Sequence, residues 1–229
     1  MQFDVAIRMT EILLALAFIQ QSCEHLVGER RERMIGAARL GASLFLLAGV
    51  LVPWACAALV GLAFAYLYRF QGPYNGGSDR MGILILFCLT GSHVLPGHQM
   101  QELAFGYLAV QLVMSYVISG WVKIVHPEWR RGQALQDVFC FSAYPVSEEL
   151  RGWADRPRLL FAMSWAVMGF ELIFPLALFT PVTLIAALCI AMVFHGANAC
   201  LFGLNRFLWT WIAAYPSLIW LQSRLFVGG

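Results

Sequence analysis

Residues 181–203, PVTLIAALCIAMVFHGANACLFG, continue for 23 positions without an Asp, Glu, Lys or Arg. About 20 mostly apolar residues are enough for an α-helix to cross the hydrocarbon core of a membrane. Pro181 stands at the start of the run, where a helix loses no backbone hydrogen bond to a proline. The stretch therefore predicts a membrane-spanning helix, and the rest of the chain follows the same pattern.

Seven further apolar runs precede or follow this one. They cover residues 5–27, 34–52, 53–70, 81–97, 103–125, 159–179 and 206–226. We therefore expect an all-α, polytopic transmembrane helix bundle of about eight helices. Residues 1–229 would form a single domain with no sizeable soluble part. Gly91 and Pro96 predict a late break in the helix of residues 81–97.

The composition supports this fold class. Hydrophobic residues make up 60% of the 229 positions and charged residues only 12%, whereas soluble domains carry about 25% charged residues. Too little polar surface remains to face water, so we expect membrane lipid as a partner and no nucleic acid. The first run lacks a small-residue cleavage site, which predicts a retained helix rather than a signal peptide.

The basic residues are distributed unequally between the two sides of the predicted bundle. One side carries 13 of the 15 Lys and Arg residues. These are Arg30, Arg31, Arg33, Arg39, Arg69, Arg80, Lys123, Arg130, Arg131, Arg151, Arg156, Arg158 and Arg206. The positive-inside rule then predicts cytoplasmic basic loops and termini on the outside. We expect the protein in a bacterial inner (cytoplasmic) membrane.

The longest connection, residues 126–158, contains a second kind of helix. Residues 132–141 predict a short helix lying in the membrane interface, with Leu135, Val138 and Phe139 facing lipid.

Ionisable and polar side chains inside the predicted spans are the first candidates for function. Each ionisable residue in a bilayer costs about 2.5–3.5 kcal/mol on insertion scales, and such residues usually face the bundle interior. The set consists of Glu11, Glu24, His25, His93, Gln111, Tyr116, Lys123, Glu171, His195 and Asn198. The five histidines and six cysteines show no metal-ligand spacing and no CxxC pair, so no metal is predicted.

Spacing narrows this set. Tyr116 and Lys123 are seven residues apart and share a helix face, as do His195 and Asn198, which are three apart. An apolar environment disfavours the ammonium form of a lysine, and a neutral amine is a competent general base. The alternatives are a lysine whose ammonium reaches the interface, interhelical hydrogen bonding by His195 and Asn198, and a structural ion pair made by Glu171.

A turn-forming stretch precedes the fourth run. Its residues Tyr74, Asn75, Gly76, Gly77 and Ser78 include two glycines that tolerate positive φ. Successive N–H groups there can form an anion-binding nest. The alternative is a capped turn, in which Ser78 or Asp79 caps the following helix.

Four stretches together resemble the membrane part of vitamin K-dependent gamma-glutamyl carboxylases and their bacterial relatives, the HTTM (horizontally transferred transmembrane) proteins. They are residues 116–123 (YVISGWVK), Trp129 with Gly132, residues 147–150 (SEEL) and residues 194–202 (FHGANACLF), in the family's order. Residues 74–78 also resemble a carboxylase stretch. The resemblance extends from Tyr116 to Trp220.

The resemblance implies a chemistry. In the carboxylases, the lysine that matches Lys123 deprotonates vitamin K hydroquinone, and oxygen then converts the quinol to an epoxide while a peptide glutamate is carboxylated. Tyr116 matches a pocket tyrosine, and Glu171 falls where the family has an acidic residue. Lys123, Tyr116 and His195 are therefore candidate catalytic residues. The candidate ligand-binding residues are Tyr74, Asn75, Gly76, Gly77, Ser78, His93, Glu171 and Asn198.

The chain also departs from the carboxylases. It has Gly77 where they have a functional histidine, and we expect no counterpart of their large C-terminal domain. We therefore expect quinol- and oxygen-dependent oxidation or epoxidation, with a reduced quinone or another hydrophobic small molecule as ligand, and not full glutamate carboxylation. The alternative is a non-catalytic membrane accessory that binds a peptide, such as a toxin precursor, or a partner enzyme.

Overall fold

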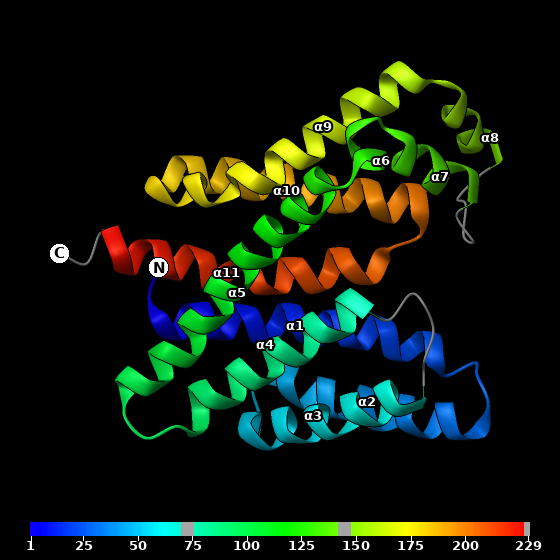
Figure 1. The fold of residues 1–229 in the computed structure, drawn as a ribbon. Helices are drawn as coiled ribbons and strands as arrows, with labels where there is room; N and C mark the ends of the chain where they lie inside the picture. Colours follow the sequence, from blue (N-terminus) through cyan, green and yellow to red (C-terminus); the bar gives the residue numbers. More distant parts are fainter. Residues whose placement is uncertain (70–75, 142–147, 227–229) are drawn as a thin grey trace. The chain divides into compact units, whose positions relative to one another are not determined.

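A computed structural model describes residues 1–69, 76–141 and 148–226, and these residues contain no β-strand (Figure 1). The described part has eight helices of 17 residues or more. They are α1 (Phe3–His25), α2 (Arg30–Ala48), α3 (Val52–Arg69), α4 (Gly76–Val94), α5 (His98–Val125), α9 (Pro157–Ile173), α10 (Pro181–Phe202) and α11 (Asn205–Phe226). The predicted all-α bundle is confirmed.

Short helices connect α5 to α9 and α9 to α10. They are α6 (Pro127–Arg130), α7 (Gln133–Phe141), α8 (Glu148–Arg151) and the 3₁₀ turns η1 (Gly152–Asp155) and η2 (Phe174–Phe179). The run at 159–179 is thus one α-helix followed by a 3₁₀ segment. Pro175 lies at the start of that segment, where the α-helical hydrogen-bonding pattern cannot continue through a proline.

Three helical segments are long and apolar enough to cross a membrane, judged by length and composition over the described residues. They are His98–Val125, Pro157–Phe179 and Pro181–Phe202. The last begins with a capping box between Thr180 and Thr183 and ends at Gly203, whose φ of 70° closes the helix in the left-handed region. Pro181–Phe202 therefore forms the expected helix, and it is long and apolar enough to cross a membrane.

Gly91 does not break α4, contrary to the sequence-based expectation. The helix continues to Val94, and the Leu95 N–H still donates to the Gly91 carbonyl. A Cβ at position 91 would lie 3.0 Å from the Cβ of Ala104 on α5. The glycine thus allows two backbones to approach closely, and α4 ends just before Pro96.

The chain divides into two compact units. The first comprises Met1–Val110 with Arg206–Gly229, and the second comprises Gln111–Asn205. In the first unit, α1 packs against α2, α2 against α3, and α3 against α4. In the second unit, α7 packs against α9 and η1, and η2 packs against α10. The polar pairs described below lie within one unit or the other.

The connection helix α7 forms where the sequence predicted it, but its apolar side chains are oriented differently. Leu135 and Phe139 are buried in a small core with Ala154 and Leu160, and Cys140, Trp153 and Phe202 pack against this core. Val138 remains exposed. The prediction that all three face lipid is therefore wrong for Leu135 and Phe139, because the η1 turn and the first residues of α9 supply a protein surface for them.

Truncation of Phe139 tests this packing. We expect Phe139→Ala to lower the free energy of unfolding by about 3–5 kcal/mol, since it opens a cavity in the core. Val138→Ala, the matched control on the exposed face, should cost less than about 1 kcal/mol. Both values are measured by unfolding in mixed detergent micelles. Equal effects of the two substitutions would contradict the packing.

Candidate functional site

Lys123 and Glu171 form an ion pair between α5 and α9. The Lys123 Nζ atom lies 2.7 Å from Oε1 and 2.7 Å from Oε2 of Glu171. The Glu171 side chain is 4% exposed and that of Lys123 is 18% exposed. The carboxylate is therefore enclosed by protein, while the amine remains accessible from one side.

A glycine explains how the two helices come this close. A Cβ at Gly120 would lie 3.0 Å from the Cβ of Glu171 and 2.9 Å from the Cγ of Leu172. Both distances are shorter than ordinary van der Waals contacts, so that a larger residue would push α9 away. Gly120 therefore allows Glu171 to lie beside Lys123, which follows Gly120 by about one turn on α5.

Trp129 adds an aromatic face to the pair. Its ring centroid lies 5.4 Å from the Lys123 Nζ atom, within the range of a cation–π interaction. Its carbonyl accepts a hydrogen bond from the Ser164 hydroxyl of α9 at 2.6 Å, which ties α6 to α9. Sequence reasoning did not include Trp129 among the site residues, although the tryptophan was part of the motif that carried the resemblance.

A second polar pair joins α5 to α10. The Tyr116 hydroxyl and the His195 Nε2 atom are 3.0 Å apart, and both side chains are buried. The Tyr116 ring stacks on Phe174 with centroids 4.1 Å apart, and Phe170 contacts it edge-on. Asn198 follows one turn after His195 on α10 and is half-buried.

These two pairs share one helix. Seven residues of α-helix rise about 10 Å, so Tyr116 and Lys123 stand two turns apart on the same side of α5. The arrangement places an amine, a phenol and an imidazole next to aromatic rings.

The structure describes only part of the stretch 74–78 that was predicted to bind a ligand. Tyr74 and Asn75 lie outside the described residues. Gly76, Gly77 and Ser78 belong to the first turn of α4, which starts five residues earlier than expected, so that Ser78 is not a cap. A Cβ at Gly77 would lie 2.6 Å from the Phe207 ring of α11, and a side chain there would have to displace that ring.

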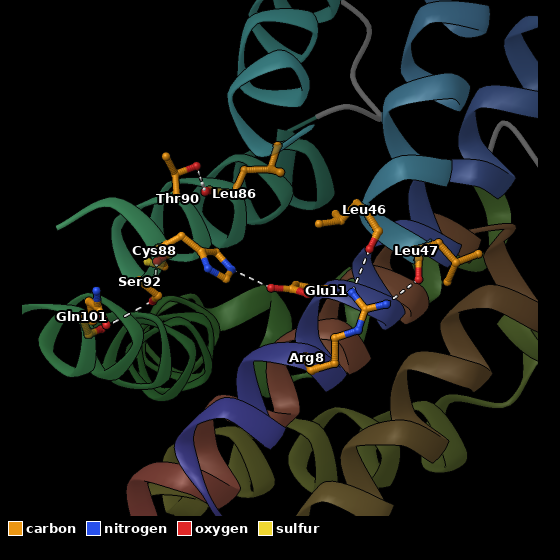
Figure 2. A network of polar contacts seen from close by, with 10 residues as sticks. Arg8, Glu11, Leu46, Leu47, Leu86, Cys88, Thr90, Ser92 and Gln101 are labelled. Atoms are coloured by element: carbon orange, nitrogen blue, oxygen red, sulfur yellow. Dashed lines mark hydrogen bonds and ion pairs between the residues drawn. The ribbon is translucent and has the colours of Figure 1, made fainter. Parts of the chain in front are cut away.

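His93 belongs to a separate network in the first unit. Its Nε2 atom is 2.6 Å from Oε1 of Glu11, whose Oε2 accepts a hydrogen bond from Arg8 at 2.7 Å. Arg8 also donates to the carbonyls of Leu46 and Leu47 at the end of α2 (Figure 2). The sequence indicated Glu11 and His93 as polar residues inside spans, but it gave no sign of Arg8 as their partner.

Adding a methyl group at Gly120 tests the contact between α5 and α9. Gly120→Ala should destabilise the fold by about 1–3 kcal/mol, because the methyl group overlaps Leu172 and Glu171. Gly169→Ala is the matched control, since a Cβ there meets nothing within 4 Å, and it should be neutral or stabilising by up to about 1 kcal/mol. Detergent unfolding of both variants gives the comparison, and a neutral Gly120→Ala would refute the close contact.

Removing the Tyr116 hydroxyl tests the second pair. Tyr116→Phe should cost about 1 kcal/mol, because the hydrogen bond to His195 is lost while the stacking on Phe174 is kept. Tyr107→Phe serves as control, since Tyr107 is exposed, and its unfolding free energy should not change. A difference of less than a few tenths of a kcal/mol between the two variants would speak against the pair.

Comparison with known proteins gives one match. A family model described as an HTTM domain matches residues 97–222. No curated protein and no solved structure matches the chain. The match covers more than half of the 229 residues and includes the whole second unit, with its helices apolar enough to cross a membrane. The chain therefore belongs to the HTTM family and is a membrane protein.

Proposed function

We propose that the chain binds a quinone or another hydrophobic small molecule within the membrane, and that Lys123 is the general base of a quinol- and oxygen-dependent oxidation. The observation that carries this proposal is the Lys123–Glu171 pair, an enclosed carboxylate holding an accessible amine in apolar helices. The family resemblance, which assigns the same role to the matching lysine, supports it.

The pair is suited to exchanging a proton. A proton can pass from Nζ to Glu171 over the 2.7 Å that separates them, which leaves a neutral amine without changing the net charge of the pair. That amine can accept the proton of a ligand hydroxyl, the step required of a general base. Trp129 then faces the ammonium that forms.

The remaining residues would bind and orient the ligand. Phe170, Phe174 and the Tyr116 ring offer aromatic surfaces, and the Tyr116–His195 pair offers a hydrogen bond about two turns away from Lys123. Asn198 adds a half-buried amide. A bound quinol would supply the electrons that reduce dioxygen. We further propose a bacterial inner membrane location with cytoplasmic basic loops and both termini outside.

A second candidate function is non-catalytic. The observation that favours it is that Glu171 places both carboxylate oxygens against the Lys123 ammonium, as a purely structural ion pair would. In that case the chain is a membrane accessory that binds a peptide or anchors a partner enzyme. In addition, the chain has Gly77, beside the Phe207 ring, at the position where the carboxylases carry a functional histidine.

Quinol oxidation distinguishes the two candidates. The protein in mild detergent receives reduced menaquinone or vitamin K with oxygen, and epoxide is detected by mass spectrometry. We expect product from the wild type and none from Lys123→Met, because a thioether cannot accept the proton. Absence of epoxide from folded wild-type protein would reject the catalytic proposal and favour the accessory function.

Stability must be separated from chemistry. Lys123→Met alone leaves Glu171 buried without its cation and should cost about 3–5 kcal/mol. Replacing both residues with methionine removes the unpaired charge and should restore most of that stability. If the double variant folds like wild type and still makes no epoxide, the lysine acts chemically. If it makes epoxide, Lys123 is only structural.

A further inference from the structure

A cavity in the first unit lies apart from the residues of the proposed function. Its volume is about 530 Å³, and it opens among the starts of α1, α3 and α5 and the ends of α2 and α4. Polar groups line much of it, among them Asp4, Arg8, Glu11, Ser92, His93 and Gln101. We refer to it as the Glu11 cavity, since Glu11 is the most deeply buried of these charged residues at 2% exposure.

The hydrogen-bond donors of the Glu11 cavity are directed at the protein itself. Arg8 donates from Nη1 to Glu11 and to the Leu46 carbonyl, and from Nη2 to the Leu47 carbonyl (Figure 2). The guanidinium also lies against Gly49, where a Cβ would be 3.2 Å from its central carbon. Arg8 is thereby fixed on the carbonyl end of α2, and its bonds to Glu11, Leu46 and Leu47 occupy three of the five N–H donors of a guanidinium.

Ser92 and Gln101 also donate to backbone carbonyls of the protein. The Ser92 hydroxyl donates to the Cys88 carbonyl at 2.7 Å, and the Gln101 side-chain nitrogen donates to the Leu95 carbonyl at 3.1 Å. Arg8, Ser92 and Gln101 thus each donate to the protein, and a ligand that brings its own donors suits this lining better than one that needs them.

Acceptors, by contrast, remain in excess. Each Glu11 oxygen has one partner, Arg8 or His93, and a carboxylate oxygen can accept two hydrogen bonds. The side-chain oxygen of Gln101 can also accept a hydrogen bond. Asp4 adds an exposed carboxylate. The lining thus carries two carboxylates, Asp4 and Glu11, and one guanidinium, Arg8.

We propose that the Glu11 cavity binds a protonated amine, whose N–H groups donate to Asp4, Glu11 and Gln101. The two carboxylates and their unused acceptor positions favour a cation that carries hydrogen-bond donors. A volume of about 530 Å³ exceeds the space of a bare ion and falls in the range of small-molecule sites. Moreover, no group of three or more His, Cys, Asp or Glu residues in the described part of the chain is arranged to hold a metal ion.

The amine can come from two sources. The cavity lies at helix ends, which in a membrane protein are near the lipid headgroups. A primary ammonium reaches that depth either as a free small amine or as the headgroup of phosphatidylethanolamine. Both offer the same N–H donors, so the recognition chemistry is shared.

Titration calorimetry with ethanolamine on the full-length protein in detergent tests the proposal. We expect saturable binding to wild type and at least about fivefold weaker binding to Asp4→Asn, the fold-change that corresponds to about 1 kcal/mol for a partly exposed charge. Asp137→Asn, an exposed carboxylate of α7, is the matched control and should bind like wild type. No saturable binding, or equal binding by all three proteins, would overturn the proposal.

A second variant examines the buried carboxylate. Glu11→Gln keeps the shape of the side chain but removes its charge, and should also weaken ethanolamine binding in protein whose thermal unfolding shows that it is folded. If Glu11→Gln unfolds, Asp4→Asn alone decides the outcome, because Asp4 is exposed and supports no core packing.

Native mass spectrometry with lipids separates the two sources. Phosphatidylcholine shares the phosphate and positive charge of phosphatidylethanolamine but lacks N–H donors. Preferential retention of phosphatidylethanolamine that is lost in Asp4→Asn would assign the cavity to a headgroup. Ethanolamine binding without lipid preference would assign it to a free amine. If neither ligand binds in an Asp4-dependent manner, the proposal fails, and the quinol assay remains unaffected by that result.

Discussion

Lys123 and Glu171 lie in helices composed mostly of apolar residues, where a charge is tolerated only beside its counter-charge. The cost of an isolated charge in a membrane is several kcal/mol, so removal of either partner would affect the whole α5–α9 contact. The pair in turn requires that the two backbones approach closely, which Gly120 permits. Gly120 thus permits the close approach in which the ion pair forms, and the ion pair connects α5 to α9.

Buried charged groups of the first unit are likewise placed beside polar or aromatic partners. Arg39 is buried at 5% exposure, and it is accommodated by the Gln21 side-chain oxygen at 2.8 Å and by the Phe18 ring at 4.1 Å. Glu11 is shared between Arg8 and His93. In each case the charged group is held by side chains or carbonyls of neighbouring helices. The polar residues therefore fix the relative positions of helices within the unit.

The sequence was sufficient to predict the long helices and to identify residues that share a helix face, because both depend on local periodicity. The seven-residue spacing of Tyr116 and Lys123 on α5 is such a case. The pairing of Lys123 with Glu171 remained one alternative among several, since it depends on how two helices cross. Arg8 could not be recognised as a cap of α2, because its acceptors are backbone carbonyls exposed where the chain turns at Gly49. Leu135 and Phe139 were misplaced for a similar reason, since the core that buries them is formed by residues 15 or more positions later in the chain.

The Lys123–Glu171 and Tyr116–His195 pairs lie within the residues that match the family model, whereas most residues of the Glu11 cavity lie outside them. Residues 97–222 include Lys123, Glu171, Tyr116 and His195, which thus lie within the region that matches the family model. The Glu11 cavity is formed almost entirely by residues before position 97, with Gln101 as its contribution from inside the match. A chemistry common to the family would be carried by the matched helices. The recognition of a polar ligand in the Glu11 cavity would then depend mainly on α1–α4, which belong to the first unit, whereas the Lys123–Glu171 pair belongs to the second.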